Sequence, residues 1–217
     1  MESLDRTQGP ARADPPEGGR EEEDDAEEAD ERETEDDGKA PVSQGPGVAP
    51  FFKGWQLQNE RLVGALRPLG AEQLGLPVGS PDWPIWASAS HIAGTRVFWL
   101  CTVFGEPGIE TTPFAGSGYV GWEDDLGHPR SGEELAGALG STWRIIERCL
   151  ATWTPESLGQ EARRVSGSEV QLHTRQSVLF RMLTHEAYHT GEISLTLGSA
   201  GLDAIDLWRG LGRVVQS

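Results

Sequence analysis

The residues best suited to chemistry stand late in the chain, in the stretch HEAYHTGE at positions 185–192. In a helix, His185 and His189 would lie about 40° apart on one face, with their Cβ atoms about 5–6 Å apart. Both imidazoles can then reach one metal ion at about 2.0–2.1 Å. Glu192 lies about 40° from the same face, so it can be a further metal ligand, a base, or an acceptor that orients a ligand.

The first five letters of this stretch also spell HExxH, the pattern of zinc peptidases in which the glutamate is the general base. A peptidase would use Glu186 in that role and would need a third ligand further along the chain. In metzincins a glycine and a histidine follow, at positions where this chain has Glu192 and Leu195. After Glu192 only Asp203 and Asp206 remain as acidic candidates. An HExxH-type zinc peptidase is therefore the weakest of the functions that the stretch allows.

Glu186 itself falls at the centre of the apolar stripe of the predicted helix, which consists of Leu179, Leu183, Ile193 and Leu197. An unpaired carboxylate in such a place is costly. We therefore expect Glu186 to pair with an arginine or a hydroxyl group of a neighbouring helix, or to lie near the end of the bundle where water reaches it.

A third histidine, His91, lies on an upstream segment of helical periodicity. The apolar stripe of that segment consists of Ile85, Ile92, Trp99 and Val103. His91 lies about 100° round from this stripe, as His185 does from its own. The three histidines together therefore predict a facial metal site at one end of a bundle, with open positions for water or substrate. His128 and His173 fall in connecting segments, and we expect them at the surface.

Four segments with apolar residues at helical spacing must position these side chains. They span about residues 50–66, 85–104, 131–153 and 174–199, and the third opens with the capping-box pattern SGEE. A loop of roughly 25 residues that holds Tyr119 and Trp122 precedes the third segment, and its aromatic content favours packing. The polar, alternating stretch between residues 158 and 173 favours a short hairpin. Four helices joined by one or two long connections predict an all-α four-helix bundle over residues 49–217.

Residues 1–48 are predicted to form a disordered acidic tail. The first fifty residues hold 17 Asp and Glu against 5 Lys and Arg, which gives −12 of the overall net charge of −17. A segment so polar cannot bury enough apolar surface to fold. Because the chain is acidic and lacks a basic patch, we expect no nucleic acid partner. No apolar run approaches the ~18 residues that a membrane span needs, so we expect no membrane association.

The two cysteines, Cys101 and Cys149, both fall within helical patterns and are flanked by bulky apolar residues. This placement predicts buried, reduced thiols. Reduced thiols suit a cytoplasmic protein.

Four quoted motifs give the chain a resemblance to a known family: WPIWASASHIAG around His91, the loop segment GWEDDLGHPR, the final-helix stretch HEAYHTGEISLTLGSAGL, and a closing DLW. Over about residues 51–208 the sequence resembles the DinB superfamily of metal-binding four-helix bundles. The resemblance implies that His91, His185 and His189 bind one divalent ion, most often zinc or nickel, with water completing the coordination. Family members of known activity hold a low-molecular-weight thiol, such as bacillithiol or mycothiol, as the thiolate at such a metal.

By this resemblance the chain would be a metal-dependent thiol S-transferase or a hydrolase that acts on a small molecule, and it would form a homodimer. Glu192, the candidate catalytic residue, stands where the family often has glutamine, and the acidic tail is not part of the family pattern. The alternative is a non-catalytic helical bundle with a structural metal or none. If Glu192 completes the metal coordination, the site would be closed, as structural zinc sites are.

Overall fold

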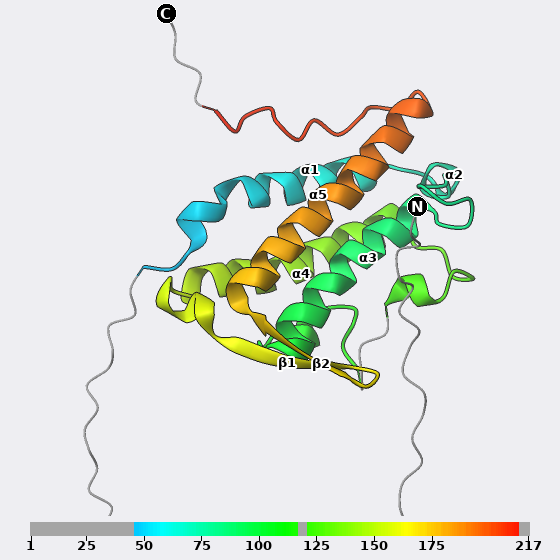
Figure 1. Ribbon diagram of the computed structural model, residues 1–217. Coiled ribbons are helices and arrows are strands. Elements are labelled where there is room, and N and C mark those ends of the chain that lie inside the picture. The colour runs from blue at the N-terminus through cyan, green and yellow to red at the C-terminus, as the bar shows by residue number, and fades with distance from the viewer. Residues whose placement is uncertain (1–45, 117–120, 213–217) are drawn as a thin grey trace, which may run out of the picture.

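The computed structural model describes residues 46–116 and 121–212. Four long helices form a bundle in it, as predicted from the sequence (Figure 1). Their bounds are α1 Lys53–Leu66, α3 Ile85–Val97, α4 Gly132–Thr152 and α5 Arg175–Ser199. A short helix, α2 Ala71–Leu74, lies between α1 and α3, and the sequence analysis did not predict it. Figure 1 shows α5 crossing over α1 and α4 to lie beside α3.

The helix boundaries follow from local hydrogen bonds. The hydroxyl of Ser131 accepts from the amide of Glu134, and the Glu134 carboxylate accepts from the amide of Ser131, so the predicted capping box begins α4. Thr174 caps α5 by accepting from the amide of Ser177. The second predicted helix does continue beyond Val97, but as a π-helical segment, Phe98–Val103.

A hairpin connects α4 to α5, as the alternating stretch predicted. Strand β1 spans Glu161–Ser166 and pairs antiparallel with β2, Glu169–Thr174. Gly167, at φ 58°, supplies the left-handed residue of the turn. The hairpin packs beside the π-helical end of α3, where the guanidinium of Arg164 lies over the ring of Phe98. The bundle therefore carries a small two-stranded sheet in addition to its helices.

Helix α3 is the most enclosed element of the core. Every residue of Ile85–Val97 is buried except His91 and Thr95, which are half-buried. The helix is rich in alanine, serine and glycine, and these small side chains let neighbouring helices approach closely. Consequently only the narrow face of α3 that carries His91 and Thr95 remains accessible.

The segments that flank the helices are anchored in part. Val48, the last residue of the predicted tail, is buried, and its amide donates to the carbonyl of Trp153 at 3.0 Å, so the packed part of the chain includes this residue. The preceding acidic segment, residues 1–45, lies outside the described residues, as does Tyr119 of the long loop. Trp122 of that loop is half-buried against Phe114, with ring centroids 5.3 Å apart. In the described part of the chain, no helix is long and apolar enough to cross a membrane.

Candidate metal centre

The three predicted histidines come together between two helices. His91 projects from α3, and His185 and His189 project from α5; one ligand nitrogen from each lies within 4.8 Å of the other two. The Nε2 atoms of His91 and His185 are 3.0 Å apart. Two nitrogens that bind one ion at about 2.1 Å and at right angles are themselves about 3.0 Å apart. The spacing of His91 and His185 therefore fits a single metal ion, and a ligand nitrogen of His189 lies within 4.8 Å of both.

Two carboxylates fix the orientation of the histidine rings. Nδ1 of His91 lies 3.0 Å from Oε1 of Glu123, and Nδ1 of His189 lies 2.8 Å from Oε2 of Glu192. A carboxylate can only accept, so each neutral ring carries its proton on Nδ1 and has a free lone pair on Nε2. Carboxylates hold metal-binding histidines in this way. The contact of Glu192 with His189 is the one that an orienting acceptor makes, which is one of the three roles that the sequence allowed for Glu192.

His185 has no such carboxylate beside it. Its Nδ1 is buried and has no hydrogen-bond partner among the described residues, while its Nε2 faces that of His91. If His185 donates from Nε2, its Nδ1 lone pair is left buried and unpaired. If its proton is on Nδ1, two Nε2 lone pairs face each other at 3.0 Å. The second arrangement is the one that a bound cation would stabilise, so the residues present fit a metal ion.

Burial keeps His185 and His189 neutral. Burial and then the nearby charges of His189 and His91, with a smaller effect of Arg181, lower the pKa of His185 to about 3. The pKa of His189 is also lowered, first by burial and then by His91, although the Glu192 carboxylate opposes this shift. Metal binding requires neutral imidazoles. At neutral pH these two rings are therefore in the form that binds a metal.

A glycine makes room for the carboxylate that orients His91. A Cβ atom at Gly121 would overlap the carboxylate of Glu123 in its present position, so another residue here would shift that carboxylate. Gly79, at φ 69°, lies beside Glu192, where a Cβ atom would be 3.5 Å from Oε1. Glu123 therefore depends on a loop outside the histidine-bearing helices, whereas Glu192 lies on α5 itself. Glu123 was not among the residues predicted from the sequence, although it lies in the segment GWEDDLGHPR.

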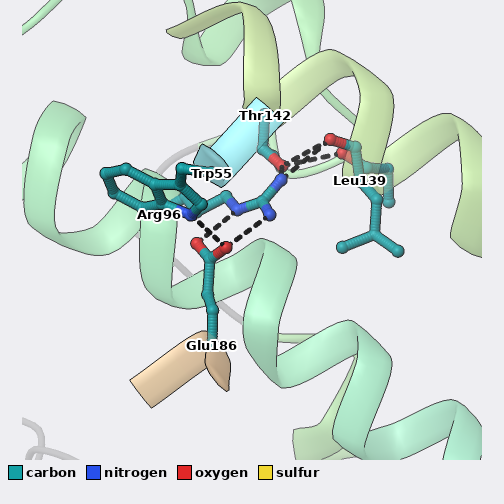
Figure 2. Close-up of polar contacts among 6 residues, drawn as sticks. Trp55, Arg96, Leu139, Thr142 and Glu186 are labelled. Atoms are coloured by element: carbon teal, nitrogen blue, oxygen red, sulfur yellow. Dashed lines mark hydrogen bonds and ion pairs between the residues drawn. The ribbon is translucent and has the colours of Figure 1, made fainter. Parts of the chain in front are cut away.

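The Glu186 carboxylate is buried and points toward the guanidinium of Arg96 (Figure 2). Arg96 of α3 donates to it from Nε at 2.7 Å and from a terminal nitrogen at 2.8 Å, and Nε1 of Trp55 donates at 2.7 Å. Arg96 is 0% exposed and also donates to the carbonyl of Leu139 at 2.9 Å. The expected pairing of Glu186 with an arginine of a neighbouring helix is thus confirmed. Bound in this way, Glu186 cannot act as the general base of a peptidase.

The remaining histidines lie away from the triad. His128 is exposed and its Nδ1 lies 2.5 Å from a carboxylate oxygen of Asp125. His173, in the hairpin, is half-buried against the ring of Trp99, with ring centroids 4.8 Å apart. The prediction of a surface position therefore holds for His128, whereas His173 is partly covered because the hairpin packs on α3.

Fold and site together define a class of protein, a four-helix bundle that carries a three-histidine cluster on two of its helices. The family model of the DinB superfamily matches residues 55–193, and the chain belongs to this superfamily. A crystal structure of a DinB-like protein from Bacillus cereus ATCC 10987 has a similar fold, with a TM-score of 0.54 and 20% sequence identity. That match covers 73% of this chain and 96% of the other. No curated protein sequence matches the chain.

Proposed function

We propose that this protein is a metal-dependent enzyme that acts on a small molecule, with one divalent ion, zinc or nickel, bound by His91, His185 and His189. The observation that carries the proposal is the number of protein ligands. In the described part of the chain, the cluster contains three ligand residues. Glu123 and Glu192 lie against Nδ1 atoms. Structural zinc sites usually close with a fourth protein ligand, whereas catalytic sites leave a position open.

The proposed chemistry is transfer of a low-molecular-weight thiol, or hydrolysis. When bound, the ion would lower the pKa of a thiol or a water molecule beside it. Glu123 and Glu192 hold the Nδ1 protons of two histidines, and so keep their Nε2 lone pairs directed into the cluster. Glu192 also contacts Tyr188, and a hydrogen bond with this carboxylate is the main cause that raises the pKa of the Tyr188 phenol. A further catalytic role of Glu192 would involve this pair. The exposed phenol of Tyr188 thus lies at the rim of the cluster.

The structural contacts also bear on the alternatives. The peptidase mechanism lacks its base, because Glu186 is bound by Arg96 and Trp55. A non-catalytic bundle with a structural metal would require a fourth protein ligand, and Glu192 is directed to a histidine Nδ1. Cys101 and Cys149 are free thiols, which supports a cytoplasmic location. The homodimer implied by the family resemblance is tested by light scattering of the full chain.

Metal analysis of protein purified without a histidine tag tests the proposal. We expect one divalent ion per chain in the wild type, and loss of this ion in His91→Ala and in His189→Ala. The exposed His128→Ala is the matched control and should keep its metal. Stoichiometric metal that survives both triad substitutions would contradict the site.

Activity assays then separate the functions. Wild-type protein with its metal is assayed for thiol transfer to electrophilic small molecules, for ester and amide hydrolysis, and for peptide cleavage. We expect activity in the first or second assay and none in the third. A metal-loaded protein inactive in all three would favour the non-catalytic bundle.

A further inference from the structure

A cluster of positively charged side chains lies where the hairpin packs against α5 and the π-helical end of α3; Figure 1 shows the hairpin at the lower end of the bundle. The guanidinium carbon of Arg181 lies 5.0 Å from the centroid of the Trp99 ring, and that of Arg164 lies 5.6 Å from the same ring. The ring of His173 lies 4.8 Å from it. We refer to Arg164, Arg181 and His173 around Trp99 as the basic cluster.

The two arginines of the basic cluster form no ion pair among the described residues. Neither Arg164 nor Arg181 forms an ion pair with a carboxylate within residues 46–116 and 121–212, whereas Arg96 and Arg175 each do. Arg164 donates only to the side-chain amide oxygen of Gln171, at 3.4 Å. The pKa of His173 is lowered first by burial and then by the charges of Arg181 and Arg164, so both arginines are close enough to affect the same imidazole ring. An otherwise acidic chain therefore concentrates positive potential here, which attracts anions.

The basic cluster is aligned with the histidine triad along both helices. On α5, Arg181 lies one turn before His185 on the same face, about 6 Å away along the axis. On α3, the accessible face runs from His91 through Thr95 to the half-buried Phe98, about 10 Å along the axis. The guanidinium of Arg164 covers Phe98, with its carbon 5.4 Å from the ring centroid. The face that leads away from the triad toward the hairpin thus ends at two arginines.

We propose that the basic cluster binds the anionic end, a carboxylate or phosphate, of a small molecule whose reactive atom lies at the histidine triad. This inference rests on the proposed function of the triad and adds the class of substrate to it. The substrate would be an anion with about 6–10 Å between its charge and its reactive atom. Arg181 and Arg164 donate to the anion, while Trp99 and Phe98 hold the guanidinium planes in place.

Anion binding by the full-length chain tests this inference without any metal. The probes are succinate and inorganic phosphate, titrated by calorimetry at low ionic strength. We expect the dissociation constant of the preferred anion to rise about tenfold in Arg181→Gln and in Arg164→Gln, as for the loss of one charge-assisted hydrogen bond. Arg163→Gln is the matched control, since it removes the same charge from the opposite face of the same strand. Equal affinities in all four proteins, or no binding to the wild type, would overturn the inference.

A second measurement links the basic cluster to the triad. Cobalt-loaded protein is titrated with ω-mercaptoalkanoates and with ω-mercaptoalkanols of equal length, and the near-ultraviolet cobalt–thiolate absorption reports binding. We expect the carboxylate thiol to bind about tenfold more tightly in the wild type and in Arg163→Gln, and this preference to vanish in Arg181→Gln. No preference in the wild type would contradict the inference. Failure of the proposed function has a different signature, namely no uptake of cobalt while anion affinity still depends on Arg181 and Arg164.

Discussion

Replacing Glu186 by leucine should destabilise the fold severely, although it removes none of the three histidines. The substitution leaves the fully buried guanidinium of Arg96 without its two carboxylate bonds, at 2.7 and 2.8 Å, and leaves Nε1 of Trp55 without an acceptor. Removing one partner of a buried ion pair costs about 3–5 kcal/mol. Because domains of this size are stable by only about 5–15 kcal/mol, Glu186→Leu should lose a large fraction of its stability.

Urea unfolding of the metal-free protein, followed by circular dichroism, measures this loss. The exposed Glu147→Leu on α4 is the matched control, and it should change the free energy of unfolding by no more than about 0.5 kcal/mol. The double variant Arg96→Met with Glu186→Leu should recover most of the stability, because a buried ion pair can often be replaced by apolar side chains of similar volume. A decrease of less than about 1 kcal/mol in the free energy of unfolding of Glu186→Leu would refute the reasoning, since an unpaired buried charge destabilises a fold by more than that. A double variant no more stable than the single one would refute it as well.

Three further predictions concern the orienting carboxylates, the loop glycine and the thiols. Glu123→Ala and Glu192→Ala should each weaken metal affinity by about 10–100-fold while the ion still binds with one-to-one stoichiometry, as measured by competition with a chromophoric chelator. Gly121→Ala should lower metal affinity in the same assay, because its Cβ would displace the Glu123 carboxylate. Burial raises the pKa of the Cys101 thiol to about 11 and that of Cys149 to about 12, from 9.0 in the unfolded chain. The unfolded chain therefore loses these protons first, so stability to urea should hold below pH 9 and fall as the pH rises toward 11.

The histidine triad could be predicted because its geometry is mostly local. A spacing of four residues places His185 and His189 on one helical face whatever the rest of the chain does. His91 followed from the same rule, applied to its offset from an apolar stripe. The capping box at Ser131 is equally local, since its hydrogen bonds join residues three apart.

Glu123, which orients His91, could not be predicted because its position depends on the path of a loop, whereas Glu192 follows from helical spacing. Glu123 contacts His91 although the two residues are 32 positions apart in the sequence. A Cβ atom at Gly121 would overlap the Glu123 carboxylate in this position. Likewise, the pairing of Arg96 with Glu186 joins residues 90 apart. Periodicity placed Glu186 on the apolar face and so predicted that it needs a partner, but not which one. Periodicity predicted that the second helix continues to about residue 104, but it did not distinguish a π-helical end from an α-helical one, and the short α2 offers too few residues to show a period.

The residues of the HExxH pattern thus lie on two faces of α5: the two histidines on one face and Glu186 on the other. His185 and Glu186 are adjacent in sequence, so their side chains point about 100° apart. Glu186 is bound to Arg96, which lies on the same helix as His91 and also donates to the carbonyl of Leu139 in α4. We expect this contact between helices to fix the rotation of α5 about its axis, and with it the approach of His185 and His189 to His91. Buried polar pairs can set the register of packed helices in this way. The apolar double variant should therefore stay folded yet bind metal more weakly than the wild type, whereas unchanged affinity would show that packing alone aligns the triad.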